Sequence, residues 1–335
     1  MEGSMNRRTF LKEAAVVGGV AMASPWIPSM LHAQSRHSRI AFIKTTNRAD
    51  GVKRAINLLK PGSFKGKDFF IKPNFNSADP TPGSTHPDTL AALLEQLRSL
   101  GAGSFTIADR SGMGKTREVM EARDVFHLGK EMNAQVVVLD ELGAADWEPV
   151  KFNGSHWQRG FAVPVPLKKA GGIVQTCCLK THRYGGHFTL SLKNSVGLAA
   201  KYVPGDSYNY MRELHDSPDQ RRMIAEINTA YKPDLVVLDG VDAFVTGGPD
   251  SGKEVSAQVI LAGTDRIAID AVGVALLRFY GTTPEVSRGS VFAQDQIARA
   301  VELGLGVSKA DQIELLTDDA PSAEYAKKIR SVLIA

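Results

Sequence analysis

The feature that most constrains the fold is an alternation of short apolar runs with longer amphipathic stretches, which continues through most of the chain. Short apolar runs bounded by turn residues are typical of buried strands, and amphipathic stretches between them are typical of helices. Such alternation indicates βαβ units. We therefore predict an α/β fold with a mainly parallel sheet flanked by helices, in one large domain or one divided into two lobes.

The expected elements follow from this pattern. Strands are predicted at Arg39–Lys44, Asp68–Lys72, Phe105–Ala108, Val136–Leu139, Gly172–Cys177, Leu235–Leu238 and Val259–Ala262, with an edge strand at Gln312–Leu315. Helices are predicted at Asp50–Lys60, Thr85–Leu100, Arg117–Glu121, Val125–Met132, Pro218–Tyr231, Arg266–Tyr280 and Val291–Leu303. Thr85 is the expected N-cap of the second helix, with Pro87 in its first turn.

Residues 1–34 are interpreted as an export signal. Asn6-Arg7-Arg8-Thr9-Phe10-Leu11-Lys12 is similar to a twin-arginine motif, a mildly apolar run follows at 14–23, and Leu31-His32-Ala33 fits a cleavage site. We expect passage through the twin-arginine translocase, a periplasmic or otherwise exported location, and a domain over 35–335. The alternative is an ordinary amphipathic helix. The apolar run is too short to span a bilayer, so we expect no stable membrane anchor.

Charge and cysteine content exclude two classes. Without residues 1–34, 37 Lys and Arg face 34 Asp and Glu, a formal net charge of +3. No basic block is interleaved with aromatic residues, so we expect no nucleic-acid partner. The only two cysteines, Cys177 and Cys178, are adjacent, which leaves no ligand set for an iron–sulfur cluster. We expect them to be small apolar residues of a strand, with at least one of them buried.

Polar and charged residues follow six of the predicted strands. The carboxyl ends of parallel strands share one edge of the sheet, and open α/β sheets bind ligands outside that edge. Ordinary turn chemistry is the alternative for any single residue, because a buried strand must end in something polar. The residues that converge in this way predict a site: Lys72 and Asn74, Asp109, Asp140, Lys180 and His182, Asp239, and Asp265.

The segment 177–198 concentrates this signal. Lys180, His182, His187 and Lys193 lie within fourteen residues, with Gly185-Gly186 between them and Asn194 after them. Two ammonium groups and two imidazoles would repel one another if all were charged and dry. An anion on the lysines or a metal on neutral imidazoles would relieve this repulsion. The alternatives are a solvated basic loop, or a lysine paired with Asp239 or Asp265.

Familiar catalytic motifs are absent from the sequence. Ser111-Gly112-Met113-Gly114-Lys115-Thr116 resembles a phosphate loop, but Asp109 stands where a Walker motif has its first glycine. There is no Gly-x-Gly-x-x-Gly after the first strand, no Gly-x-Ser-x-Gly elbow and no zinc spacing.

Several blocks resemble an uncharacterised family, domain of unknown function (DUF) 362. They are Lys72-Pro73-Asn74, Thr85-His86-Pro87, Leu179-Lys180-Thr181-His182, Ser191-Leu192-Lys193-Asn194 with Gly197, Asp239-Gly240, Gly247-Gly248-Pro249 with Gly252, and Asp265 with Asp270-Ala271. The resemblance covers about 40–280. Some members of that family carry a ferredoxin-type segment, whose cysteines this chain lacks, so no iron–sulfur cluster is implied.

A fainter similarity points to the N-terminal domain of nickel-dependent lactate racemases. Thr85-His86, then His182 through Gly185-Gly186 to Lys193, stand in a similar order. In that family the corresponding lysine carries a covalently held nickel pincer cofactor. The run 187–192 before Lys193 departs from the family's Gly/Ser-rich loop, which puts the shared cofactor in doubt.

Together these patterns predict one anion-binding site for a small carboxylate or phosphate ligand. We expect His182 to act as acid or base, with Lys193 and Lys180 as its catalytic partners. The cofactor is unknown, and a divalent metal is one candidate. The alternative function is a non-enzymatic periplasmic metal- or anion-binding protein. The other expected ligand-binding residues are Lys72, Asn74, His86, Asn194 and Asp239, and the candidate metal ligands are His86, His182 and His187.

Overall fold

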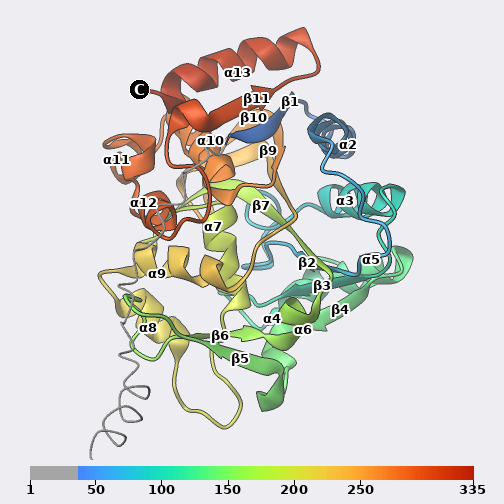
Figure 1. Cartoon of the computed structure of the whole chain (residues 1–335), viewed down its shortest axis with the longest axis vertical. Helices are drawn as coiled ribbons and strands as arrows, with labels where there is room; N and C mark the ends of the chain where they lie inside the picture. The colour runs from blue at the N-terminus through green and yellow to red at the C-terminus, as the bar shows by residue number, and fades with distance from the viewer. Residues whose placement is uncertain (1–36) are drawn as a thin grey trace, which may run out of the picture. The chain divides into compact units, whose positions relative to one another are not determined.

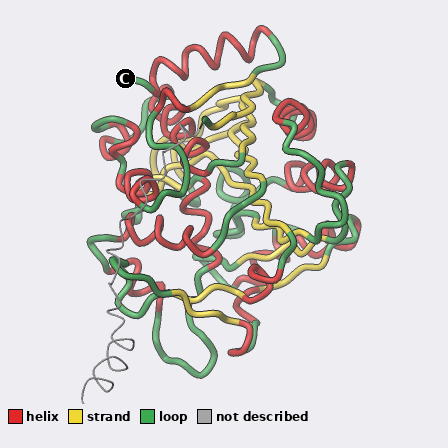
Figure 2. Tube along the Cα trace, in the orientation of Figure 1, coloured by secondary structure: helices red, strands yellow, loops and turns green. Residues whose placement is uncertain are grey.

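A mixed nine-stranded sheet forms the centre of the computed structural model, which describes residues 37–335 (Figures 1 and 2). Its strand order is β11-β1-β10-β9-β7-β2-β3-β4, and β8 pairs with the end of β7. Seven strands run in one direction, while β10 and β8 run antiparallel to their neighbours. The predicted α/β class and mainly parallel sheet are confirmed.

The bounds of the elements are as follows. The strands of the large sheet are β1 (Ser38–Lys44), β2 (Phe69–Lys72), β3 (Phe105–Asp109), β4 (Gln135–Val138), β7 (Gly172–His182), β8 (His187–Thr189), β9 (Leu235–Gly247), β10 (Gly252–Gly263) and β11 (Ile313–Leu316). A separate hairpin pairs β5 (Trp147–Val150) with β6 (Phe161–Pro164). The α-helices are α2 (Arg48–Leu59), α3 (Pro87–Ser99), α4 (Thr116–Ala122), α5 (Val125–Glu131), α6 (Val165–Lys169), α7 (Ser191–Asn194), α8 (Tyr210–Asp216), α9 (Gln220–Ile227), α10 (Arg266–Phe279), α11 (Pro284–Ser287), α12 (Asp295–Glu302) and α13 (Ala320–Leu333).

Helices cover both faces of the sheet. One apolar cluster packs α2, α3, α4 and α5 against one face, and a second packs α10, α12 and α13 against the other. Figure 1 shows α2, α3 and α5 on one side of the strands and α10 and α12 on the other. A third cluster joins the β5–β6 hairpin to α8 and α9. The strand β7 is buried along all eleven residues, as expected for a strand covered on both faces.

Two predicted features of the sheet are wrong. The strand β10 was expected to run parallel to its neighbours, but it returns antiparallel from β9 through the short turn at 248–251. The strand β7 was expected to end at Cys177 but continues to His182, because its last three residues pair with β8. Cys177 and Cys178 are both buried, with free thiols.

Local chemistry also differs at α3. The side chain of His86, rather than that of Thr85, caps the helix by accepting a hydrogen bond from the backbone N–H of Asp88 at 3.1 Å. The hydroxyl of Thr85 instead accepts from the backbone N–H of Asn74 at 2.8 Å and so fixes the segment after β2. The sequence reading also missed α13 and the β5–β6 hairpin.

None of the helices among residues 37–335 has the length and apolar character needed to cross a membrane.

Candidate functional site

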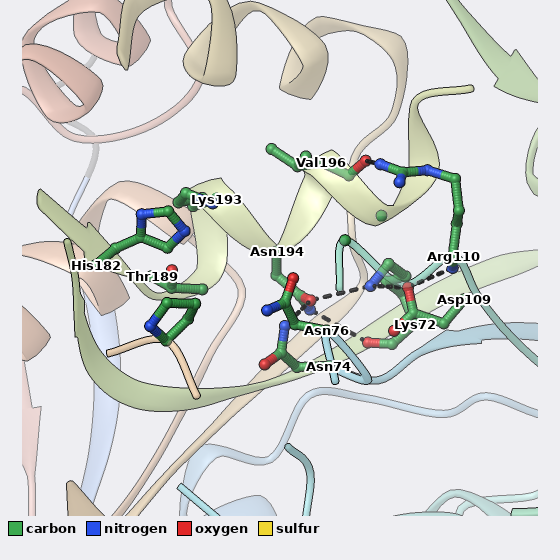
Figure 3. Close-up of a pocket in the computed structure, with 13 residues that line it drawn as sticks. Lys72, Asn74, Asn76, Asp109, Arg110, His182, Thr189, Lys193, Asn194 and Val196 are labelled. Atoms are coloured by element: carbon green, nitrogen blue, oxygen red, sulfur yellow. Dashed lines mark hydrogen bonds and ion pairs between the residues drawn. The ribbon is translucent and has the colours of Figure 1, made fainter. Parts of the chain in front are cut away.

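A small polar cavity lies where β2, β3 and β7 end beside α7 (Figure 3). Its volume is about 30 Å³, and it adjoins an outer cleft of about 540 Å³. We call these the inner cavity and the outer cleft. Asn76, Arg110, Gly112, His182, Lys193, Val196 and Pro249 line both of them. The inner cavity is completed by Lys72, Asn74, Asp109, Thr189, Asn194 and Gly197, and the outer cleft by Met113, Tyr184, Lys201, Asn209, Met211, Arg212 and His215.

The short helix α7 is held in place at its start by a carboxylate. Asp270, buried in α10, accepts hydrogen bonds from the backbone N–H groups of Ser191 and Leu192 at 2.7 and 3.0 Å. Burial raises the pKa of Asp270 to about 8, although these two hydrogen bonds oppose the rise. These two hydrogen bonds fix the start of α7 and therefore the directions in which the side chains of Lys193 and Asn194 point from it.

Asn194 connects α7 to the segment after β2. Its side-chain oxygen accepts from the Lys72 ammonium at 3.0 Å and from the Asn74 amide at 3.3 Å. Its amide donates to the backbone oxygen of Thr176 at 3.1 Å. One buried side chain therefore joins three of the elements around the inner cavity.

Lys72 and Asp109 form a buried ion pair at the floor. The ammonium lies 2.7 Å from the Asp109 carboxylate, and both side chains are almost inaccessible. Burial lowers the pKa of Lys72 and raises that of Asp109, while the attraction between the two opposes both shifts. Gly197 permits this approach, because a Cβ there would stand 2.3 Å from the Asp109 oxygen.

The side chain of Arg110 lies along the wall of the inner cavity, and its guanidinium faces uncharged backbone carbonyl oxygens. Its guanidinium donates to the backbone carbonyls of Ala199, Ser111 and Val196 at 2.8, 3.0 and 2.7 Å. Burial lowers its pKa, with Asp140 and Asp109 opposing that shift. Its positive charge therefore contributes to the potential inside the cavity.

The side chain of Lys193 makes no hydrogen bond or ion pair within residues 37–335, although only 9% of the residue's surface is exposed. Burial, then repulsion from Lys180 and Arg110, lowers its pKa to about 7. The backbone approaches it closely at Gly186, where a Cβ would stand 2.6 Å from its Cε atom. A largely buried ammonium group without a protein partner is unfavourable, and a ligand in the adjoining cleft would supply a partner.

His182 shares this environment. Its Nδ1 atom is buried and has no hydrogen-bond partner in the described structure. Burial, then the charges of Lys193 and Lys180, holds the pKa of His182 well below its ordinary value, so the imidazole is neutral near pH 7. Its ring packs edge-on against Tyr184 at the mouth of the outer cleft.

Four unpartnered polar atoms share the inner cavity. They are Nδ1 of His182, Oδ1 of Asn74, Nδ2 of Asn76 and Oγ1 of Thr189. Buried polar atoms nearly always have a hydrogen-bond partner, from the protein or from bound solvent or ligand. In the view of Figure 3, His182, Thr189 and Lys193 lie on one side of the cavity and Asn74, Asn76, Lys72 and Asp109 lie across from them.

Three residues predicted for this site lie outside it and are fully engaged. Lys180 donates to the carbonyls of Gly83 and Pro249, which ties two loops together behind the cavity wall. Asp239 binds Arg48 at 2.9 Å and the hydroxyl of Thr89 at 2.6 Å. His86 caps α3, as described above. Lys180 and Asp239 have partners from distant segments, whereas His86 binds the backbone two residues further along the chain.

Asp265 and His187 also lie outside both volumes. Because β10 runs antiparallel, Asp265 follows it at the opposite edge of the sheet, where it caps α10 and accepts from the N–H of Ile267 at 2.8 Å. His187 pairs across from His182 in β8 but does not line the cavity. The solvated-loop alternative for Lys193 is wrong, because the residue is buried.

The predicted metal site on His86, His182 and His187 is not formed by a group of neighbouring ligands. Within the part of the chain that the structure describes, no three His, Cys, Asp or Glu side chains are placed to hold a metal ion. A bound metal stays a prediction.

The sequence reading did not assign Arg110, Asn76 or Thr189 to the site, yet all three line the inner cavity. The signal for Arg110 and Asn76 was present, since Arg110 directly follows β3 and Asn76 lies four residues beyond the end of β2. Thr189 gave no such signal, because it comes from the short strand β8.

The match to a family model agrees with the resemblance of the sequence blocks to domain of unknown function 362. The model of the family described as Domain of unknown function (DUF362) matches residues 70–275. A thylakoid-associated protein from Synechocystis sp. is 25% identical over 233 residues, 66% of this chain, and the chain spans 65% of that relative's length. The lactate racemase apoprotein from Thermoanaerobacterium thermosaccharolyticum aligns over 86% of this chain and 85% of its own, at 16% identity and a TM-score of 0.41. A likeness at that level supports no statement about cofactor or activity.

Proposed function

Because the chain belongs to the DUF362 family, whose description assigns no activity, we propose its function from the site itself: it binds a small anionic molecule in the inner cavity. The observation that carries the proposal is the set of four unpartnered polar atoms gathered around an amine that also has no partner. A ligand that both accepts and donates hydrogen bonds would satisfy them.

The charges favour an anion. Among the described residues, Asp109 is the one acidic side chain that lines the inner cavity, and Lys72 neutralises it at 2.7 Å. Within the described residues the Arg110 guanidinium binds backbone carbonyls and forms no ion pair, and the protonated fraction of Lys193 has no carboxylate partner. A carboxylate or phosphate group of the ligand would supply the missing negative charge.

The dimensions favour a ligand in two parts. A space of about 30 Å³ takes a group of a few atoms, since one water needs roughly 10–15 Å³ measured in this way. The outer cleft, at about 540 Å³, lies within the range of small-molecule sites, roughly 300–1,000 Å³. A ligand would place one polar end inside and its remaining body in the outer cleft.

His182 gives the site the means for proton transfer. A neutral imidazole with an unpartnered nitrogen can accept a proton from a bound ligand. Strongly shifted pKa values gather at functional sites, and here the pKa of Lys193 and that of His182 are both lowered in one cavity. These features favour an enzyme that uses His182 as acid or base over a protein that only binds.

The experiment is a thermal melt and titration calorimetry with a panel of carboxylates, phosphates and divalent metals. We expect a carboxylate or phosphate to stabilise the wild type and Lys193→Met to weaken its binding at least tenfold. Lys67→Met is the matched control, because Lys67 does not line the cavity. Its ammonium lies 3.0 Å from the Asp234 carboxylate. Anion binding that survives Lys193→Met unchanged would refute the proposal.

The same experiment separates an enzyme from a binder. The ligand that binds is recovered and analysed after incubation with wild type and with His182→Gln. An enzyme alters the ligand or exchanges its hydrogens with deuterated water, and the variant slows this by roughly a hundredfold or more. A ligand recovered unchanged from the wild type would identify a binding protein.

Export is proposed from Arg7 and Arg8, which lie in residues outside the described structure. Fusion of 1–34 to a reporter that folds in the cytoplasm tests this. We expect the reporter in the periplasm, and its retention in the cytoplasm when both arginines become lysine. Periplasmic delivery that is insensitive to this change would exclude the twin-arginine route.

A further inference from the structure

We propose that Lys193 is a nucleophile that condenses with an aldehyde or ketone carrying an acid group, forming an imine in the inner cavity. This inference rests on the proposed function, because the same cavity would hold the acid group. It adds a substrate class and a covalent step.

The first support is that Lys193 is available. The other two buried lysines at this edge of the sheet are occupied: Lys72 binds Asp109 and Asn194, and Lys180 binds the carbonyls of Gly83 and Pro249. Lys193 alone among the three points into the cavity without an oxygen partner in the described structure. An amine that served to hold a fold would have one.

The second support is the sign of the surrounding charge. The charged groups that act on Lys193 are Lys180 and Arg110, both cationic, and no carboxylate stabilises its ammonium form. Desolvation and neighbouring cations are the two ways in which proteins turn a lysine into a nucleophile. With its pKa lowered to about 7, about half of the side chain is the free amine at neutral pH.

The third support is a proton carrier beside the amine. A Cβ built on Gly186 would lie 2.6 Å from Cε of Lys193 and 3.0 Å from Nδ1 of His182, so the two groups flank the same point of the backbone. The hydroxyl of Thr189 lines the same cavity and has no partner. Imine formation needs a group that moves protons between nitrogen and oxygen.

The step balances without an oxidant or reductant. The Lys193 nitrogen pair forms a bond to the carbonyl carbon, and the π pair of the carbonyl moves to its oxygen. His182 takes a proton from the nitrogen and returns it to that oxygen, giving a carbinolamine. Loss of the oxygen as water, with a second proton from the nitrogen, leaves the C=N bond.

The acid group of the ligand has a place beside this reaction. Arg110 and Asn76 line both the inner cavity and the outer cleft, as Lys193 does. A molecule with its carbonyl carbon at Lys193 would therefore share its cavity with a cation and an amide donor. Its remaining atoms would lie in the outer cleft toward Tyr184.

The test is reductive trapping on the full chain. The protein is incubated at pH 7 with 4-oxobutanoate and cyanoborohydride, and the adduct is located by peptide mass spectrometry. We expect one adduct, on Lys193, that forms at least tenfold faster than on exposed Lys115. An ordinary lysine is only about one part in two thousand free amine at this pH. Lys193→Met should lose the adduct, and Lys67→Met should keep it.

A non-condensing analogue, 4-hydroxybutanoate, separates the two proposals. If it stabilises the wild type while 4-oxobutanoate and butanal leave Lys193 unmodified, the nucleophile is wrong and anion binding stands. If Lys193 is trapped by butanal as fast as by 4-oxobutanoate, and 4-hydroxybutanoate does not bind, the inference that the substrate carries an acid group is wrong. Adducts spread evenly over exposed lysines also overturn the inference.

His182→Gln tests the role of the imidazole. We expect it to slow trapping by roughly a hundredfold, while binding of 4-hydroxybutanoate changes less than threefold. Equal slowing of trapping and loss of binding would mean that His182 only shapes the cavity.

Discussion

Two groups of polar residues at the carboxyl edge of this sheet look alike in the sequence and differ in the structure. In the closed group, Lys180, Asp239 and His86 each have partners within the protein. In the open group, Asn74, His182 and Lys193 surround a cavity with side-chain atoms that have none in the described structure. Charge at a strand end therefore does not separate the two groups, whereas the gathering of unpartnered polar atoms around one cavity does.

The physical basis of the difference is the cost of burying a polar group. A buried group with its partner is near neutral in free energy, and one without a partner costs roughly 1–3 kcal/mol or more. Substitutions in the closed group should therefore mainly lower the free energy of unfolding, and substitutions in the open group should mainly lower ligand affinity. The predictions below test that division.

The largest effect is expected from Asp239→Ala. It leaves Arg48 without its 2.9 Å partner and Thr89 without its acceptor, so we expect a loss of about 3–5 kcal/mol of unfolding free energy. Urea denaturation measures it. Asp242→Ala is the control, since that carboxylate also binds Arg48 but is more exposed, and its loss should be smaller. Equal losses would contradict the closed role of Asp239.

The second prediction concerns Lys193 and pH. Its folded pKa of about 7 lies below the ordinary value of 10.5, so the unfolded chain binds the extra proton between these values. The cost of burying Lys193 is therefore fully present below pH 7 and is released as pH rises toward 10.5. Relative to Lys193→Met, the wild type should gain about 1 kcal/mol per pH unit between pH 7 and 9. Chemical denaturation of both proteins at pH 7, 8 and 9 measures this difference, and parallel curves would show that the ammonium is paired.

The third prediction uses Gly186→Ala. The new methyl group would displace Lys193 Cε and crowd His182 Nδ1, so ligand binding should fall about tenfold or more. Stability should change by no more than about 1 kcal/mol, because the end of a lysine can move. Gly143→Ala, on a distant turn, is the control. Unchanged ligand affinity, measured by calorimetry, would place the ligand elsewhere.

The smallest effect is expected from His86→Ala. It removes the side-chain cap of α3 and should cost about 1 kcal/mol, while ligand affinity stays the same. His86→Asn should restore most of the stability, because asparagine is a good N-cap. Thermal melts with and without ligand measure both effects. If ligand no longer raises the melting temperature of His86→Ala, His86 belongs to the open group.

The sequence pattern located most strands but not every direction. The runs at β1, β2, β3 and β4 were found within one or two residues, because buried strands need apolar side chains. The antiparallel return of β10 was missed, since both β9 and β10 extend through polar residues toward the turn at Gly248-Pro249. The predicted strands, Leu235–Leu238 and Val259–Ala262, stood twenty residues apart, which left room for a crossover helix, whereas the observed connection at 248–251 leaves none.

Of the candidate site, the sequence located Lys72, Asn74, His182, Lys193 and Asn194, all of which line the inner cavity. It misplaced His86 because its imidazole caps α3 at the nearby Asp88, and it misplaced Lys180 and Asp239 because their partners come from remote segments. Arg48, for example, is 191 positions from Asp239. It left out Arg110, whose strand-end position carried the same signal as that of Lys72.

The sequence by itself determined that buried parallel strands would end in polar side chains at one edge, because apolar runs must be covered and their ends must meet water or partners. Only the tertiary structure decided which of those side chains have partners. Hydrogen bonds and ion pairs act over a few ångströms, and the contacts that neutralise Lys72, Lys180 and Asp239 join segments far apart in the chain. The side chain of Lys193 has no such partner in the described structure, and we therefore expect the function to depend on it.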